Sequence, residues 1–180
     1  MHLEHKYCQI GADVEVTEGT VISGYASLFG MADQGGDVVD VGAYRQSLGG
    51  LKAKGRTIKM LWQHDPAQPI GVWDEVREDD KGLWVKGRLL PDVAKAREAA
   101  ALLEAGAIDG LSIGYRTVKA KKDNTGKRHL SELELWEVSL VTFPMLPDAR
   151  VGAKGDDPDA TDMRELASAL DEARQTIARV

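Results

Sequence analysis

The sequence predicts a mainly β domain with flanking helices (α+β), built on an antiparallel β-barrel of about seven strands. Three observations lead to this fold class. Runs rich in β-branched and aromatic residues follow one another along the chain, as strands in hairpin order do. Polar turns that contain glycine separate neighbouring runs. Only two internal segments have a helical pattern, which is too few for strands and helices that alternate.

The first strands are predicted near the N-terminus. Residues 6–16 are expected to form a hairpin broken at Gly11, and residues 21–29 a further strand. Residues 30–36 form a glycine-rich loop that leads into a short apolar run at 38–41. This loop lacks the spacings of phosphate-binding glycine loops, so it is interpreted as a turn and not as an anion site.

The first internal helix is predicted at residues 42–48, and the glycine pair Gly49-Gly50 is expected to end it. A buried strand is predicted at 57–62. Residues 69–76 and 83–90 are expected to pair as a hairpin around an acidic turn that contains glycine.

The second internal helix is predicted to begin after Pro91 and to end at Gly106, because apolar residues recur between them at spacings of three and four. Two more strands follow, at 111–119 and 130–143. The polar loop at 121–127 is expected to join them as an exposed hairpin.

Three parts of the chain differ in composition: residues 1–147 form the predicted domain, 148–160 a linker and 161–180 a C-terminal helix. The linker is rich in Gly, Asp and Pro. The helix carries an apolar stripe of little more than two heptads, too short for a stable coiled coil. The stripe leaves two interpretations open, a helix docked on the domain or a contact with a partner, such as a homodimer.

Composition excludes several classes of function. The net charge of −6 argues against nucleic acid as the main partner, because affinity for phosphates depends on Lys and Arg. The single cysteine, Cys8, permits neither an internal disulfide nor a cysteine zinc cage. No apolar stretch has the length of a signal peptide core or a membrane span. A soluble cytoplasmic protein without cofactor or metal is therefore expected.

Ser112 and His64 are the candidate nucleophile and base. Ser112 lies in Gly110-Leu111-Ser112-Ile113-Gly114, which matches the GxSxG elbow of α/β-hydrolases in letters only. A helix precedes this serine and a β-rich run follows it, the reverse of the elbow. His64 is 48 residues upstream, so only the fold can bring the two together. The alternatives are a small residue at a strand entry, a satisfied core histidine, and a metal-binding His64-Asp65 pair.

Glu137 is the candidate third member. Strand alternation places Glu132 and Glu134 on one face, and Leu133, Leu135 and Glu137 on the other. A carboxylate on an apolar face needs a hydrogen-bond partner, and an imidazole N–H is one candidate. A salt bridge to an arginine is the other.

Three segments together resemble the prohead (capsid maturation) serine proteases of tailed bacteriophages: Trp62-Gln63-His64-Asp65, the 110–115 segment, and residues 135–144. Shorter similar segments lie at 24–29, 36–39 and 42–44, so the likeness runs from about Val21 to Pro147. Lysogenic phages and gene transfer agents both carry such enzymes, and the sequence does not choose between a phage, a prophage and a gene transfer agent.

The resemblance implies a β-barrel flanked by helices, as in the related herpesvirus assemblins. It implies Ser112 as nucleophile, His64 as general base and Glu137 in the third position, where assemblins have a second histidine. The implied substrate is the scaffolding part of the major capsid protein, cut inside the immature capsid in the host cytoplasm before DNA is packaged. Family members often also process themselves.

Two rival functions stay open. One is a catalytically inactive capsid- or scaffold-binding assembly protein that uses the same barrel, and the other is a nonspecific esterase. The tail helix is expected to hold the protein to scaffold or shell, with self-cleavage in the linker near Lys154. Candidate oxyanion donors are backbone N–H groups at 141–146 or at Ile113.

Overall fold

The computed structural model describes residues 4–6, 16–17, 20–146 and 149. The predicted hairpin at 6–16 therefore lies almost entirely outside the described residues. The same is true of the tail helix and, apart from Ala149, of the linker. The described strands are β1 (Glu4–Lys6), β2 (Val16–Thr17), β3 (Val21–Leu28), β4 (Asp37–Val39), β5 (Lys59–Trp62), β6 (Asp65–Glu78), β7 (Gly82–Leu89), β8 (Gly110–Lys122) and β9 (Arg128–Val141). The described helices are α1 (Arg45–Ala53) and α2 (Ala94–Glu104).

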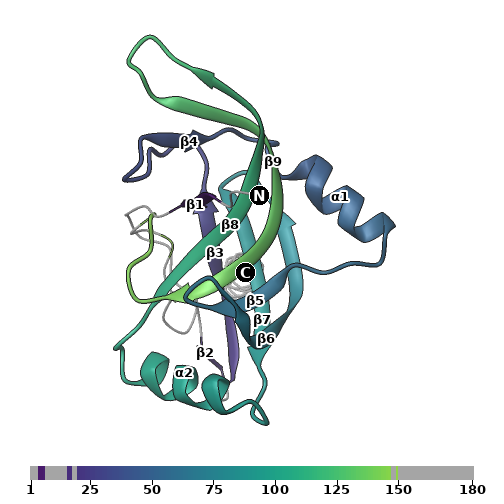
Figure 1. Cartoon of the computed structure of the whole chain (residues 1–180), viewed down its shortest axis with the longest axis vertical. Helices are drawn as coiled ribbons and strands as arrows, with labels where there is room; N and C mark the ends of the chain where they lie inside the picture. Colours follow the sequence, from purple (N-terminus) through teal and green to yellow (C-terminus); the bar gives the residue numbers. More distant parts are fainter. Residues whose placement is uncertain (1–3, 7–15, 18–19, 147–148, 150–180) are drawn as a thin grey trace, which may run out of the picture.

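All described strands belong to one nine-stranded sheet in the order β1-β8-β9-β5-β6-β7-β3-β2, with β4 added beside β9. The sheet curls into a half-barrel, and the long β8–β9 hairpin extends beyond the other strands (Figure 1). The predicted mainly β class with flanking helices is confirmed. The sheet is mixed where an antiparallel one was expected, because β4 and β5 both run parallel to β9.

The two parallel pairings share one edge of β9, whose other edge is occupied by β8. β4 pairs with the start of β9 and β5 with its end, and α1 lies between them in the chain. Along the middle of β9, backbone groups find partners around α1 instead. The N–H of Leu133 donates to the carbonyl of Ala43 (3.1 Å), and the N–H of Leu135 donates to Ser47 Oγ (2.9 Å). The α1 region thus completes the hydrogen bonding of this edge.

Helix α1 corrects the prediction for residues 42–48. The helix begins at Arg45 and runs through Gly49 and Gly50 to Ala53. It ends at Gly55, which has a φ of +60°. There the N–H of Gly55 bonds the carbonyl of Lys52, and the N–H of Arg56 bonds that of Leu51, which is a Schellman motif. The glycine pair lies in the helix because a later glycine supplies the left-handed residue that ends it.

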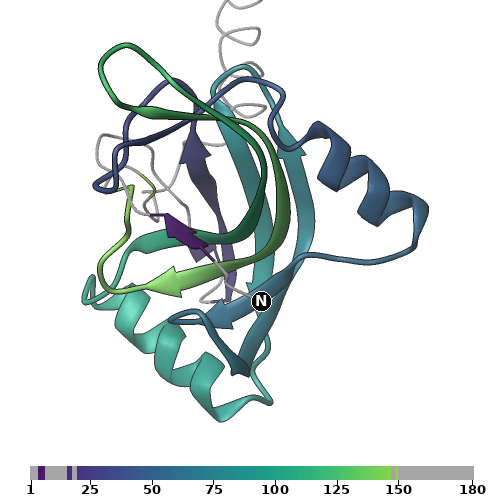
Figure 2. The same ribbon diagram turned by 45° about the horizontal axis from the view of Figure 1, so that its top comes forward.

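Helix α2 confirms the second prediction, with a start three residues after Pro91. Gly106, at a φ of +67°, follows its last turn and ends it with the same pair of hydrogen bonds. Ala96, Ala99 and Leu103 are buried against the sheet. Figure 2 shows the helix lying across the end of the half-barrel.

The core fills the inside of the curled sheet. Trp84, Tyr44 and Tyr115 are the largest of its fully buried side chains, and Trp84 meets Tyr25 edge to face with ring centroids 5.0 Å apart. Buried leucines of β8 and β9, such as Leu111 and Leu140, continue this core up to the segment that holds Ser112. Among the described residues, neither helix is long and apolar enough to cross a membrane.

Candidate active site

The register of β8 and β9 brings four residues of the site onto one face of the sheet. Ser112 lies opposite Ser139, and Gly114 lies opposite Glu137. Ser112 and Gly114 are two residues apart on their strand, as are Glu137 and Ser139, and side chains at that spacing point to the same face. The pairing of β8 and β9 alone therefore places the hydroxyl of Ser112 on the same face as the carboxylate of Glu137.

His64 reaches this face from the turn between β5 and β6. Trp62 and Asp65 pair across the hairpin, and the two residues between them, Gln63 and His64, have φ angles of 52° and 61°. Two positive φ values in a two-residue loop are typical of a type I′ turn, which usually carries Asn or Gly. Because Trp62 pairs with Leu140, the turn lies just beyond the end of β9.

The three side chains named from the sequence form a continuous hydrogen-bonded chain. His64 Nε2 lies 2.8 Å from Ser112 Oγ, and His64 Nδ1 lies 2.6 Å from Glu137 Oε1. Ser112 is fully buried, and 9% of the His64 side chain is exposed. The predicted proximity of Ser112 and His64 is observed, and the open alternatives for Glu137 resolve to a contact with the imidazole.

This arrangement determines where the protons lie. An ionised Glu137 only accepts hydrogen bonds, so its contact with Nδ1 requires the imidazole proton on Nδ1. The lone pair of Nε2 then faces the hydroxyl of Ser112 and can take its proton. The geometry therefore supports activation of a serine for attack on an electrophile.

Ser139 completes the coordination of the carboxylate and was not identified from the sequence. Its hydroxyl donates to Glu137 Oε2 (2.5 Å) and accepts from the backbone N–H of His64 (3.1 Å). The available signal was its position two residues after Glu137, on the same face of one strand.

Gly114 makes room for the carboxylate. A Cβ placed on this residue would lie 2.0 Å from Glu137 Oε1. The glycine is therefore required by a close approach of a side chain, and the GxSxG spacing that it completes has no elbow geometry here. Ser112 lies inside a 13-residue strand, so the prediction that the elbow interpretation fails is confirmed.

The rejected metal interpretation of His64-Asp65 can be compared with the contacts of Asp65. Its carboxylate accepts from the N–H of Ala67 and from the side-chain amide of Gln68, both at 2.8 Å. Within the part of the chain that the structure describes, no group of three or more His, Cys, Asp or Glu side chains is placed to hold a metal ion.

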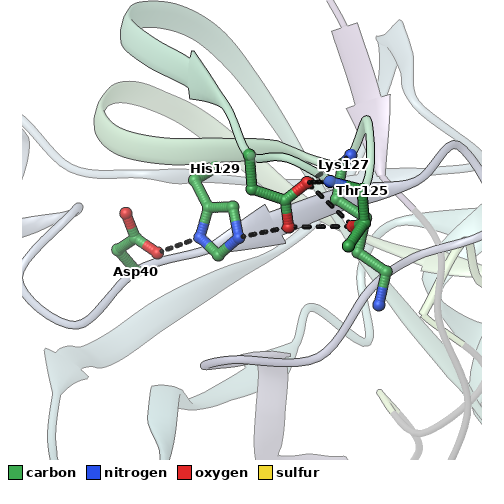
Figure 3. Close-up of polar contacts among 5 residues, drawn as sticks. Asp40, Thr125, Lys127 and His129 are labelled. Atoms are coloured by element: carbon green, nitrogen blue, oxygen red, sulfur yellow. Dashed lines mark hydrogen bonds and ion pairs between the residues drawn. The ribbon is translucent and has the colours of Figure 1, made fainter.

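A second histidine, His129, lies near the β8–β9 loop. Its Nδ1 is 2.8 Å from Asp40 Oδ1, and its Nε2 is 3.6 Å from Asp123 Oδ2 (Figure 3). The hydrogen bond with Asp40 raises the pKa of His129, and the charge of Asp123 adds to this effect. Hydrogen bonds from Thr125 lower the pKa of Asp123. This cluster joins the hairpin loop to the residue that follows β4.

The strand that carries Ser112 is also contacted from the C-terminal side. The N–H of Leu111 donates to the carbonyl of Ala149 at 2.7 Å, and Ala149 is fully buried. The chain that follows the domain therefore passes within one residue of Ser112 along β8.

Comparisons with known proteins show which proteins this chain is similar to. A family model described as caudovirus prohead serine protease matches residues 10–164. The prohead protease of Enterobacteria phage HK97 is 33% identical over 138 residues, which cover 74% of this chain and 59% of the HK97 protein. A capsid polyprotein of Pseudomonas phage PAJU2 is 34% identical over 102 residues, which are 52% of this chain and 15% of that protein.

One solved structure has a similar fold. The capsid assembly protease of bacteriophage T4 matches with a TM-score of 0.60 at 13% sequence identity, covering 77% of this chain and 98% of that one. The T4 structure supports the fold alone, at this level of identity. The family match and the HK97 relative carry the assignment that follows.

Proposed function

Because the chain belongs to the caudovirus prohead serine protease family, we propose that it is a serine endopeptidase of capsid maturation. The observation that carries the proposal is the unbroken chain from Ser112 Oγ through the His64 imidazole to the Glu137 carboxylate, with distances of 2.8 and 2.6 Å. Family membership alone would be compatible with a degenerate site, and three side chains in this geometry argue against one.

In the proposed mechanism, Ser112 Oγ attacks the peptide carbonyl carbon while His64 Nε2 takes its proton. The tetrahedral intermediate collapses, and the imidazolium returns the proton to the leaving amine. Water then attacks the acyl-enzyme while His64 takes its proton; the acyl–Oγ bond breaks, the imidazolium returns the proton to Ser112 Oγ, and the carboxylic acid product leaves. Glu137 keeps the proton of the neutral imidazole on Nδ1 and stabilises the imidazolium that forms in both steps. Backbone N–H groups at Ile113 or at 141–146 stay the predicted oxyanion donors.

The proposed substrate is the scaffolding part of the major capsid protein, cleaved inside the immature capsid in the host cytoplasm. One relative supports a capsid protein as partner, since a segment similar to this chain forms 15% of a protein named capsid polyprotein. The chain spans 59% of the length of the HK97 relative. The substrate and partners of this chain are therefore proposals.

Self-cleavage is proposed for the segment after the domain. Ala149 bonds the strand of Ser112 one residue from the nucleophile, so the chain that continues from it starts close to the site. We expect purified active protein to lose its C-terminal segment near Lys154 during incubation, as measured by intact mass spectrometry. An unchanged mass beside a protein that still cleaves capsid protein would contradict self-cleavage.

The main test is co-expression with the major capsid protein of the same genome. Wild-type protein is expected to yield shortened capsid protein, and Ser112→Ala to leave it at full length. Equal capsid protein lengths with both versions would favour the rival function, an inactive assembly protein. Turnover of small esters without any peptide cleavage would instead favour a nonspecific esterase.

A further inference from the structure

The turn that carries His64 has an unfavourable backbone conformation. Gln63 and His64 are neighbours, both lie in the left-handed region, and neither is glycine. Such conformations persist only where surrounding contacts impose them, and they gather at sites where the geometry is used. The contacts that impose this one can be identified among the described residues.

Strand β9 binds both backbone N–H groups of the turn. The N–H of Gln63 donates to the carbonyl of Leu140 at 2.9 Å, and the N–H of His64 donates to Ser139 Oγ at 3.1 Å. The first of these bonds continues the parallel pairing of β5 with β9. The second bond is made to a side-chain oxygen, so it depends on the residue at 139.

The side chain of Gln63 closes the outer side of the turn. Its Nε2 donates to Thr142 Oγ1 at 2.8 Å, and its Oε1 accepts from the N–H of Thr142 at 3.3 Å. Two bonds between the same pair fix direction as well as distance. The turn is therefore held by Ser139 and Leu140 of β9 and by Thr142, the residue that follows the strand.

We infer that Ser139 is a positioning residue for His64, and that the Gln63–Thr142 pair supports it from outside; this inference rests on the proposed peptidase function. One oxygen, Ser139 Oγ, contacts both the main chain of His64 and the far oxygen of Glu137. It therefore fixes the relative placement of the imidazole and of the carboxylate that orients it. Ser139 is fully buried, so water cannot take over either bond without a rearrangement.

Removal of the hydroxyl has two expected consequences. The backbone N–H of His64 loses its acceptor, so the turn can relax away from Ser112. The carboxylate of Glu137 loses a donor that stabilised its charge, so it stabilises the protonated imidazole more strongly. We expect kcat to fall about 10- to 100-fold. This is the loss typical when a hydrogen-bond partner that orients a metal-binding histidine is removed. KM is expected to stay within about twofold, because Ser139 lies beneath the site and does not contact substrate.

The pair Ser139→Thr and Ser139→Val gives a matched comparison, since the two replacements have similar volume and differ in the hydroxyl. Ser139→Thr is expected to keep most of the wild-type kcat, and Ser139→Val to show the full loss with the acid limb of kcat/KM shifted to higher pH. Equal kcat and unchanged pH profiles in Thr and Val variants would overturn the inference. As a control, urea unfolding measures the free energy of unfolding of both variants, which is expected to be similar.

A readout without substrate separates this inference from the proposed function. In the full chain labelled with ¹⁵N-histidine, NMR reports the tautomer of His64 and the exchange of its Nδ1 proton for wild type, Ser139→Val and Gln63→Met. We expect weaker protection of the Nδ1 proton and altered ring ¹⁵N shifts in both variants. A wild-type spectrum in both would overturn the inference even if the protein proved inactive. A wild-type protein without peptidase activity but with these shifts would contradict only the proposed function.

Discussion

Two histidines of this chain each have a carboxylate on Nδ1, and they differ in what faces the other ring nitrogen. At His64 the partner of Nε2 is the hydroxyl of Ser112 at 2.8 Å. At His129 it is a second carboxylate, that of Asp123, at 3.6 Å. A hydroxyl offers a proton that can be transferred, whereas a second carboxylate only favours the charged ring.

Burial separates the two regions further. The side chains of His64 and Glu137 are 9% and 8% exposed, and those of His129 and Asp40 are 36% and 39% exposed. Water screens the exposed pair of His129 and Asp40, so their interaction is weak. The buried pair of His64 and Glu137 lies in a region of low dielectric constant, where electrostatic interactions are stronger. An imidazole–carboxylate contact alone therefore does not define an active site. The group that faces the other ring nitrogen and the burial of the pair decide whether the histidine can act as a base.

The largest expected effect comes from exchanging each imidazole for an amide. His64→Gln is expected to lower kcat/KM by about 10⁴-fold or more, because Ser112 loses its base. His129→Gln is expected to leave kcat/KM within about twofold, since it lies outside the chain that includes Ser112. Cleavage of a capsid-derived peptide by the two variants measures the difference. A large loss in His129→Gln would break the comparison.

The next largest effect is expected from the two carboxylates. Glu137→Gln should reduce kcat by about 10³- to 10⁴-fold, because an amide in this place can stabilise the wrong tautomer of His64. Asp40→Asn serves as the matched change at His129 and is expected to leave kcat unaffected. Initial rates at saturating substrate test both. Similar losses from the two amides would show that the carboxylates act through stability rather than chemistry.

A smaller loss is expected from Gly114→Ala. The added Cβ would lie 2.0 Å from Glu137 Oε1, so the carboxylate must move. A displacement of about 1 Å in such a group costs about 10²-fold in rate, and the overpacking is expected to lower the free energy of unfolding by about 1–3 kcal/mol. Rate and urea unfolding are measured together. Wild-type rates in a stable Gly114→Ala protein would contradict the packing of this site.

The smallest effect is a pH dependence confined to the β8–β9 hairpin. The pKa of His129 is raised, so its contribution to stability is present below its ordinary value of 6.5 and is lost as the pH rises through the folded value. The pKa of Asp123 is lowered from 3.8, so its contribution is lost as the pH falls through the folded value.

We therefore expect amides at 122–128 to be most strongly protected from hydrogen exchange, after correction for intrinsic rates, between the ordinary pKa values of 3.8 for Asp123 and 6.5 for His129. Protection should decrease in wild type as the pH rises through the folded pKa of His129 and stay constant in His129→Gln over the same range. Equal pH profiles in the two proteins would exclude His129 as the source.

Alternation within one segment identified Glu137 as a buried carboxylate but placed it on the wrong face. Leu135 pairs with Tyr115 and Glu137 pairs with Gly114, so an irregularity in the strand puts Glu137 on the face opposite Leu133 and Leu135. Both faces of β9 are buried at this point. The resemblance supplied Ser112 and His64, whose contact depends on a pairing between distant strands. No local pattern encodes that pairing.

The misses have physical reasons that a local pattern does not show. The helix predicted at 42–48 was expected to end at Gly49-Gly50, but it runs to Ala53 and ends at the left-handed Gly55. Strand β6 was expected to begin at Pro69, and the structure continues it back to Asp65 through irregular pairing with β5. The bond between Ser139 and the N–H of His64 and the Gln63–Thr142 pair were overlooked because they join residues 75 and 79 positions apart. Long-range hydrogen bonds decide these contacts, whereas a left-handed glycine decides the end of the helix.

The parallel contact between β5 and β9 has a consequence for the timing of activity. The β8–β9 hairpin is local and can form early, but His64 and Ser139 are separated by 75 positions in the chain. Contacts of such long range form slowly, since a large loop must close before they contribute. We therefore expect the serine and the acid to come into register before the base during folding, so that activity requires the complete sheet.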